Sequence, residues 1–422
     1  MATILIYIVI IVFWLENSVG FQAQKLLGLS MGLSLKNISI YVLLVGWLFA
    51  VKKQGTLFNR NTLNKYLLFM LIYIVISIFP SLLSPEADIR TLKTHLVSLK
   101  LFINPWIMFF LITHIIDNKK TCKNTMLGLT ILLVITVLTM VIDNLTSIDL
   151  GTHQKGFSYK GRSAGFSEVN QYAAFLVLFL PFFLSSMIFQ NRFGKKTASG
   201  ILFLIGLTGL ILTVSRGGFI SFTFAVVVLF IIAYRHRMIG GKRIILFGLL
   251  LFLVAPVSYL IVPSDVKDMV KQRVVDPTDQ TYNPWRTESS WVQGYSSGRT
   301  KRWMQSLQIF IQKPVFGYGN DACKRVFDFS PHNDYLKILI NHGTIGFFLF
   351  IMIYIRIFLH VSFHFKTSTE RLSKMFYLGY LSGFVGYMVA MFGVGLNEPR
   401  YIFWIYTAVM YKYSQLDTVK EA

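Results

Sequence analysis

The chain has 422 residues, of which 54% are hydrophobic and 14% are charged, and its formal net charge is +22. A soluble domain has about 25% charged residues, so this composition is typical of a polytopic membrane protein. The positive charge does not indicate nucleic-acid binding, because Lys and Arg lie in short clusters between apolar runs, as they do in the cytoplasmic loops of membrane proteins.

Apolar runs of about 20 residues recur along the chain and predict an all-α fold with about twelve transmembrane helices. If the N-terminus is cytoplasmic, every dense basic cluster falls on the cytoplasmic side, so we expect both termini to be cytoplasmic. The first run has neither a basic leader nor a small-residue cleavage site, and we interpret it as a retained span. The predicted spans are 3–19, 34–51, 64–83, 96–117, 124–142, 170–190, 198–214, 217–234, 243–262, 334–358, 374–393 and 400–412.

The spans divide the chain into three parts. Residues 1–262 contain the first nine predicted helices, residues 263–333 form a long outer loop, and residues 334–422 contain the last three helices and a cytoplasmic tail. The outer loop is far longer than an ordinary connection, and its many aromatic residues indicate an ordered segment.

One stretch of this loop, "TKRWMQSLQIFIQKP", predicts an amphipathic helix on the outer membrane surface. Thr300 is its predicted N-cap, and Pro314 follows its end. The helical spacing places four apolar residues on one face: Trp303, Leu307, Phe310 and Ile311.

A histidine stands where the loop enters the next span, in "SPHNDYLKILINHGTIGFF". Ser330 is a predicted cap, which places His332 in the first helical turn, where the helix dipole disfavours a positive imidazolium. A neutral imidazole at this position can act as a general base, while the alternative is an interfacial polar residue that ends a helix. His342, ten residues further on between Asn341 and Gly343, is interpreted as part of a packed helix contact.

Several arginines are predicted on the same outer side as this histidine, in "YKGRSAGFSEVNQ", "LTVSRGGF" and "GYSSGRTKRW". Guanidinium groups match phosphate oxygens in pairs, so they indicate a diphosphate-binding site. For Arg216, which lies at the end of a predicted span, the alternative is contact with lipid headgroups. Glu168 is interpreted as a solvated loop charge. The four arginines are Arg162, Arg216, Arg299 and Arg302.

Motifs for a metal-held nucleotide are absent from the sequence, which has no D-x-D, no H-E-x-x-H and no Walker loop. Cys122 and Cys323 are predicted on opposite sides of the membrane and cannot form a disulfide. We therefore expect no metal and no cofactor, with arginine in place of a cation at the diphosphate.

Together, "SRGG", "GRTKRWMQSLQIFIQKPVFGYGND" and "HNDYLKILINHGTIGFF" resemble the shared core of the O-antigen ligase and O-antigen polymerase superfamily, over roughly residues 160–350. The resemblance implies a glycosyltransferase of the bacterial inner membrane that acts on the periplasmic face without a metal. Its implied donor is a glycan on undecaprenyl diphosphate. His332 matches the essential histidine of the family, Arg216 the arginine of the serine-arginine motif, and Arg299 the loop arginine.

Arg162 and Asn170 match a looser family pattern, "R…G-x-F…N-P-N", from which this chain departs at Glu168 and Val169. The implied mechanism is a single inverting displacement, with His332 as the base. Asn333 and Asn170 are candidates for acceptor contacts or structural support.

The acceptor separates two members of the superfamily, and the form of the "HNDYL" and "GYGN" motifs favours a polymerase, which extends a second lipid-linked glycan. The alternative is a ligase that transfers the glycan to lipid A core. Membrane lipids and a chain-length regulator are further candidate partners. A flippase or transporter and a scaffolding subunit are alternatives from other classes; the charges of this chain lie mainly at span ends, whereas transporters place them near the bilayer midplane.

Overall fold

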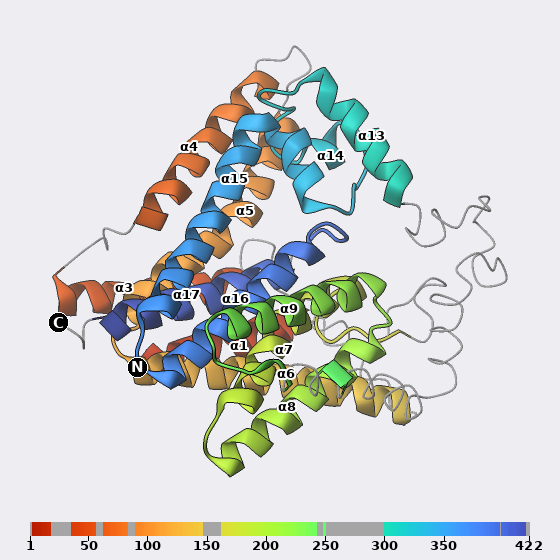
Figure 1. Cartoon of the computed structure of the whole chain (residues 1–422). Coiled ribbons are helices and arrows are strands. Elements are labelled where there is room, and N and C mark those ends of the chain that lie inside the picture. The colour runs from red at the N-terminus through yellow and green to blue at the C-terminus, as the bar shows by residue number, and fades with distance from the viewer. Residues whose placement is uncertain are drawn as a thin grey trace, which may run out of the picture.

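A computed structural model describes residues 2–17, 35–55, 62–82, 89–146, 162–242, 248–249, 299–396 and 398–418. Every element described in these ranges is a helix, as predicted (Figure 1). The helices are α1 (Ala2–Asn17), α3 (Leu35–Gln54), α4 (Thr62–Leu82), α5 (Ile89–Ile115), α6 (Lys119–Leu145), α7 (Val169–Phe189), α8 (Phe193–Leu212), α9 (Arg216–Arg235), α13 (Arg299–Gln312), α14 (Ala322–Arg325), α15 (Asp334–Thr367), α16 (Arg371–Ala390) and α17 (Glu398–Thr418).

Each predicted span except 243–262 coincides with one of these helices, and 243–262 lies outside the described residues apart from 248–249. Within the described part of the chain, 6 helices are long and apolar enough to cross a membrane. They are α6, α7, α8, α9, α15 and the part of α5 from Val97 to Ile115. The chain is a multi-pass membrane protein; the total of about twelve spans and their orientation stay predictions.

α7 is enclosed by its neighbours, and it packs against α16, α8 and α9. Its residues from Tyr172 to Pro181 are all buried. A helix that is apolar on every side is stable only when every side is covered. The approach of α16 is especially close, since a methyl group added at Gly383 would lie 2.2 Å from the carbonyl oxygen of Leu178. Glycine therefore lets the two backbones touch, as small residues do between membrane helices.

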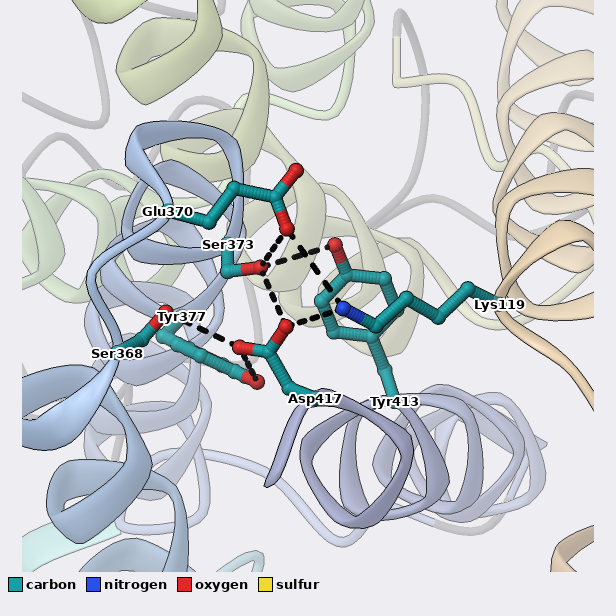
Figure 2. Close-up of polar contacts among 7 residues, drawn as sticks. All are labelled: Lys119, Ser368, Glu370, Ser373, Tyr377, Tyr413 and Asp417. Carbon is teal, nitrogen blue, oxygen red and sulfur yellow. Dashed lines mark hydrogen bonds and ion pairs between the residues drawn. The ribbon is translucent and has the colours of Figure 1, made fainter. Parts of the chain in front are cut away.

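At the end of the bundle where α6 begins and α17 ends, polar side chains form a network (Figure 2). Asp417 accepts hydrogen bonds from Ser368 at 3.0 Å and from Ser373 and Tyr377 at 3.1 Å each. It also forms an ion pair with Lys119, whose side chain is only 18% exposed. The network therefore joins the start of α6 and the start of α16 to the end of α17.

α15 is broken at Gly343, which has φ 62°, and the segment 314–319 enters the break. The N–H of Tyr318 donates to the carbonyl of Ile340 at 2.9 Å, and the N–H of Thr344 donates to the carbonyl of Pro314 at 2.8 Å. These bonds satisfy backbone groups that a break in a helix would otherwise leave unpaired. Because the segment directly follows α13, the break fixes α13 against α15.

α13 confirms the predicted amphipathic helix, but Thr300 lies within its first turn, so the predicted N-cap is wrong. Ser306 and Ile309 form its buried face. Leu307 and Ile311 are exposed, as residues facing a membrane surface would be. The rest of the predicted outer loop, up to residue 298, lies outside the described residues.

Candidate functional site

The starts of α7, α9, α13 and α15 lie close together. Ser215, the N-cap of α9, donates a hydrogen bond to Asn170 in the first turn of α7 at 3.0 Å. Nη1 of Arg299, the first residue of α13, would lie 4.0 Å from a methyl group added at Gly217 of α9. The charge of Arg299 in turn acts on His332, which precedes α15. Helix N-termini carry partial positive charge, so their convergence favours an anionic ligand.

A strained turn leads from α8 into Arg216, the first residue of α9. Val214 has φ 45°, which a β-branched residue rarely adopts. Arg162 holds this turn, because its Nε donates to the carbonyl of Thr213 at 2.9 Å and its Nη2 to Oδ1 of Asn170 at 3.0 Å. The Arg162 residue is only 2% exposed. It therefore braces the turn from inside the fold.

Glu168 is the N-cap of α7. Its carboxylate accepts backbone N–H bonds from Asn170 at 3.1 Å and Gln171 at 3.2 Å, and it accepts a third bond from the side-chain amide of Asn170 at 2.6 Å. The interpretation of Glu168 as a solvated loop charge is therefore wrong. Its negative charge also favours the charged form of Arg299.

Arg299 lies at the junction of three elements. Besides its approach to Gly217, its Nη1 would lie 3.3 Å from a methyl group added at Gly393, in the turn between α16 and α17. Loss of water lowers the pKa of the guanidinium, and repulsion from Arg302 acts in the same direction. Arginine has so high an ordinary pKa that the group stays charged near pH 7. A poorly hydrated guanidinium is well suited to a diphosphate.

The other two predicted arginines are more accessible than Arg162. Arg216 is half-buried at the first position of α9, and Arg302 is exposed in the first turn of α13. Of the four predicted arginines, Arg216 and Arg299 are half-buried and Arg302 is exposed. Arg162 alone is buried.

His332 lies before α15 and not in its first turn. The N-cap is Asn333, whose Oδ1 accepts the N–H of Leu336 at 3.1 Å, so the predicted cap at Ser330 is wrong. His332 has φ 48°, in the left-handed region, whereas helical residues have negative φ. Strained backbone of this kind collects at functional sites and is consistent with a chemical role for this residue.

The pKa of His332 is lowered to about 4. Loss of water around the ring is the largest cause, followed by repulsion from Arg302 and then from Arg299. The ring is therefore neutral near pH 7. The sequence predicted the helix dipole as the cause, whereas the causes here are loss of water and repulsion from the two arginines. The residue as a whole keeps an exposed surface.

Sequence reasoning missed a buried ion pair formed by Asp334, two residues after this histidine. Oδ1 of Asp334 lies 3.2 Å from Nη2 of Arg400, and the two side chains are 2% and 14% exposed. The only signal in the sequence is an acidic residue two positions after His332 and a basic residue at the start of the last span. Nothing in the spacing of residues 66 positions apart indicates that they meet.

His342 has the packed environment that was predicted for it. It is 0% exposed, and its Nδ1 lies 3.1 Å from the hydroxyl of Ser77 on α4. The hydroxyl of Tyr73, also on α4, donates to the carbonyl of His342 at 2.7 Å. These contacts attach α4 to α15 at the break and support a structural role.

Within the ranges that the structure describes, no group of three or more His, Cys, Asp or Glu side chains is arranged to hold a metal ion. Cys122 and Cys323 are both free and buried, in agreement with the prediction that they do not pair. Arg216, Arg299 and Arg302 supply positive charge at the candidate site.

A comparison with protein families gives a match to part of the chain. The family described as O-antigen ligase matches residues 201–351, a range that includes Arg216, Arg299, Arg302 and His332. A search of curated proteins gives no match. The family match confirms the resemblance to the O-antigen ligase and polymerase superfamily.

Proposed function

On the premise that residues 201–351 form an O-antigen ligase domain, we propose that this protein is a glycosyltransferase of the bacterial inner membrane. Its donor is a glycan on undecaprenyl diphosphate, and its site faces the periplasm. The observation that carries the proposal is the position of a neutral His332 beside the charged Arg299 and Arg302, among converging helix starts. This arrangement combines a base with a site for a diphosphate leaving group.

The reaction is a single displacement. Nε2 or Nδ1 of His332 takes the proton from an acceptor hydroxyl, and the oxygen attacks the anomeric carbon of the donor sugar. The bond from that carbon to the diphosphate oxygen breaks, and its electron pair leaves with undecaprenyl diphosphate. Attack from the opposite face inverts the anomeric centre, as in one-step glycoside hydrolysis. Arg216, Arg299 and Arg302 stabilise the charge that develops on the diphosphate.

Arg162, Asn170 and Asn333 support these groups without contacting the reacting atoms. Arg162 and Asn170 hold the turn that precedes Arg216, through bonds of 2.9 and 3.0 Å. Asn333 caps the helix that follows His332. The assignment moves Arg162 from the predicted diphosphate contacts to the support of Arg216, because its guanidinium is enclosed.

Donor binding also acts on the base. Loss of water is the largest cause of the lowered pKa of His332, and the other two causes, Arg302 and Arg299, are among the three arginines assigned to the diphosphate. A bound diphosphate offsets the positive charge of these two arginines, and this contribution acts to raise the pKa of the ring. The histidine then accepts a proton more readily when the donor is present.

The test is transfer by purified protein in lipid nanodiscs from an undecaprenyl-diphosphate-linked glycan. A polymerase gives a longer glycan on undecaprenyl diphosphate, and this product is the one we favour from the motif form. The alternative is a ligase, which gives a glycan on lipid A core when that acceptor is supplied. Whichever product forms, its rate of formation is expected to be undiminished in excess EDTA, because arginines and not a metal ion stabilise the diphosphate. Absence of both products contradicts the proposal.

The membrane orientation has a separate test. We expect residues 263–333 to face the periplasm and both termini to face the cytoplasm. A reporter fused after Val275 that is active only in the cytoplasm would place His332 on the wrong side and contradict the site assignment.

A further inference from the structure

The turn between α16 and α17, residues 391–396, lies between the start of α15 and Arg299. On the α15 side, the N–H of Asp334 donates to the carbonyl of Met391 at 2.9 Å. On the other side, a methyl group at Gly393 would lie 3.3 Å from Nη1 of Arg299. The turn therefore contacts both the start of α15, which follows the histidine, and the guanidinium of Arg299.

Asp334 holds this turn at both ends. Its Oδ2 accepts the N–H of Leu396 at 3.1 Å, and its backbone N–H binds the carbonyl of Met391. Its Oδ1 pairs with Arg400 at 3.2 Å, which ties the start of α17 to the same carboxylate. Because Asp334 is 2% exposed, these bonds are shielded from water and hold the turn firmly.

Tyr335 gives the turn a second attachment. Its hydroxyl donates to the carbonyl of Met388 at 2.8 Å, and its ring packs on Phe392 with 4.4 Å between the ring centroids. Phe392 directly precedes Gly393. Gly393, the residue that approaches Arg299, is therefore held on one side by the packing of Phe392 and on the other by the hydrogen bond of Leu396.

Gly393 is the narrow point of this contact. A methyl group 3.3 Å from Nη1 is closer than most real contacts, so the guanidinium would have to move by a fraction of an ångström. Gly395, in the same turn, differs, because a methyl group there would lie 3.9 Å from Oδ1 of Asp334, an ordinary contact. Neither Gly393 nor Gly395 has a positive φ, so the backbone at each position accepts alanine.

We propose that Asp334 and Arg400 are positioning residues, which act through the turn 391–396 to set where the guanidinium of Arg299 meets the donor diphosphate. The inference rests on the proposed function, because it gives Arg299 that role. Asp334 is enclosed and satisfied by its three bonds, so it does not touch the donor itself. The same residue also anchors the backbone that follows His332, so it keeps the base and the diphosphate site in register.

The test measures the binding of inorganic pyrophosphate to purified full-length protein by calorimetry, together with the melting temperature. Gly393→Ala is expected to raise the Kd for pyrophosphate about threefold to tenfold, because small misplacements of a binding group are costly. The melting temperature is expected to stay unchanged, since the far end of a flexible side chain can move. Gly395→Ala is the matched control and is expected to leave both quantities unchanged.

Asp334→Asn removes the ion pair and is expected to weaken pyrophosphate binding in the same way. Should this variant unfold, Gly393→Ala decides the matter alone. Wild-type affinity in Gly393→Ala overturns the positioning role while leaving the proposed function intact. If the wild-type protein does not bind pyrophosphate, or if Arg299→Ala binds it as tightly as wild type, the assignment of the diphosphate site fails, and the inference fails with it.

Discussion

A methyl group added at Gly343 would lie 2.1 Å from the carbonyl oxygen of Val315, so the break in α15 and the segment that follows α13 are in backbone contact. Gly343 also has φ 62°, which favours glycine. This contact joins the segment that follows α13 to α15. Val315 lies 16 residues after Arg299, and Gly343 lies 11 residues after His332. The geometry of the candidate site depends on this joint.

Gly343→Ala is expected to destabilise the protein by at least about 1–3 kcal/mol, the cost of holding an ordinary residue in a backbone region that essentially only glycine occupies, with the steric clash in addition. Thermal unfolding followed by tryptophan fluorescence measures the change. Gly194→Ala is the control, because an added methyl group there has nothing within 4 Å. Equal melting temperatures in the two variants would show that the joint contributes nothing to stability.

His332→Ala is expected to leave the protein inserted and folded while transfer falls about 10²–10⁴-fold, the usual effect of losing a general base. A single-turnover assay with purified protein and an undecaprenyl-diphosphate-linked donor measures it. Wild-type product levels in this variant would remove His332 from the mechanism.

The pH dependence of transfer follows from the lowered pKa of His332. A base with a pKa of about 4 is neutral at pH 7, so kcat/KM is expected to stay level on acidification and to fall only as the pH passes through about 4. Arg302→Gln removes part of the repulsion, which raises the pKa and moves this fall to higher pH. Lys301→Gln is the control, since Lys301 is not among the causes of the shift. An unmoved profile in Arg302→Gln would contradict the assigned cause.

Arg216→Lys is expected to lower transfer severely, because an ammonium group keeps the charge but loses the paired N–H groups that match a diphosphate. Arg192→Lys, at an exposed position before α8, is expected to behave as wild type. Both variants are assayed for transfer and for pyrophosphate affinity. If Arg216→Lys is silent, contact of this arginine with lipid headgroups becomes the better explanation.

The polar network in Figure 2 is expected to stabilise the end of the bundle opposite the start of α15. Lys119→Gln removes the ion pair with Asp417 and is expected to cost about 1.5–3 kcal/mol, the range for hydrogen bonds to charged groups. Lys53→Gln is matched in chemistry, but its pair with Asp117 has side chains that are 75% and 39% exposed. Exposed pairs contribute about 0–1 kcal/mol, so chemical unfolding should separate the two variants.

The sequence alone determined where the helices lie, because burial in a bilayer requires long apolar runs and hydropathy is a local property. The amphipathic character of α13 and the identities of Arg216, Arg299 and His332 as candidates followed from short motifs for the same reason. The basic clusters likewise determined the predicted orientation.

Only the tertiary structure decided how these residues are used. It enclosed Arg162 beneath the turn before α9, made Glu168 a helix cap, and placed Asn333 and not Ser330 at the start of α15. It also brought Arg400 to Asp334 across 66 positions and set two arginines near His332. Such contacts depend on which helix faces pack together, and a hydropathy pattern that is nearly uniform around each membrane helix does not specify those faces.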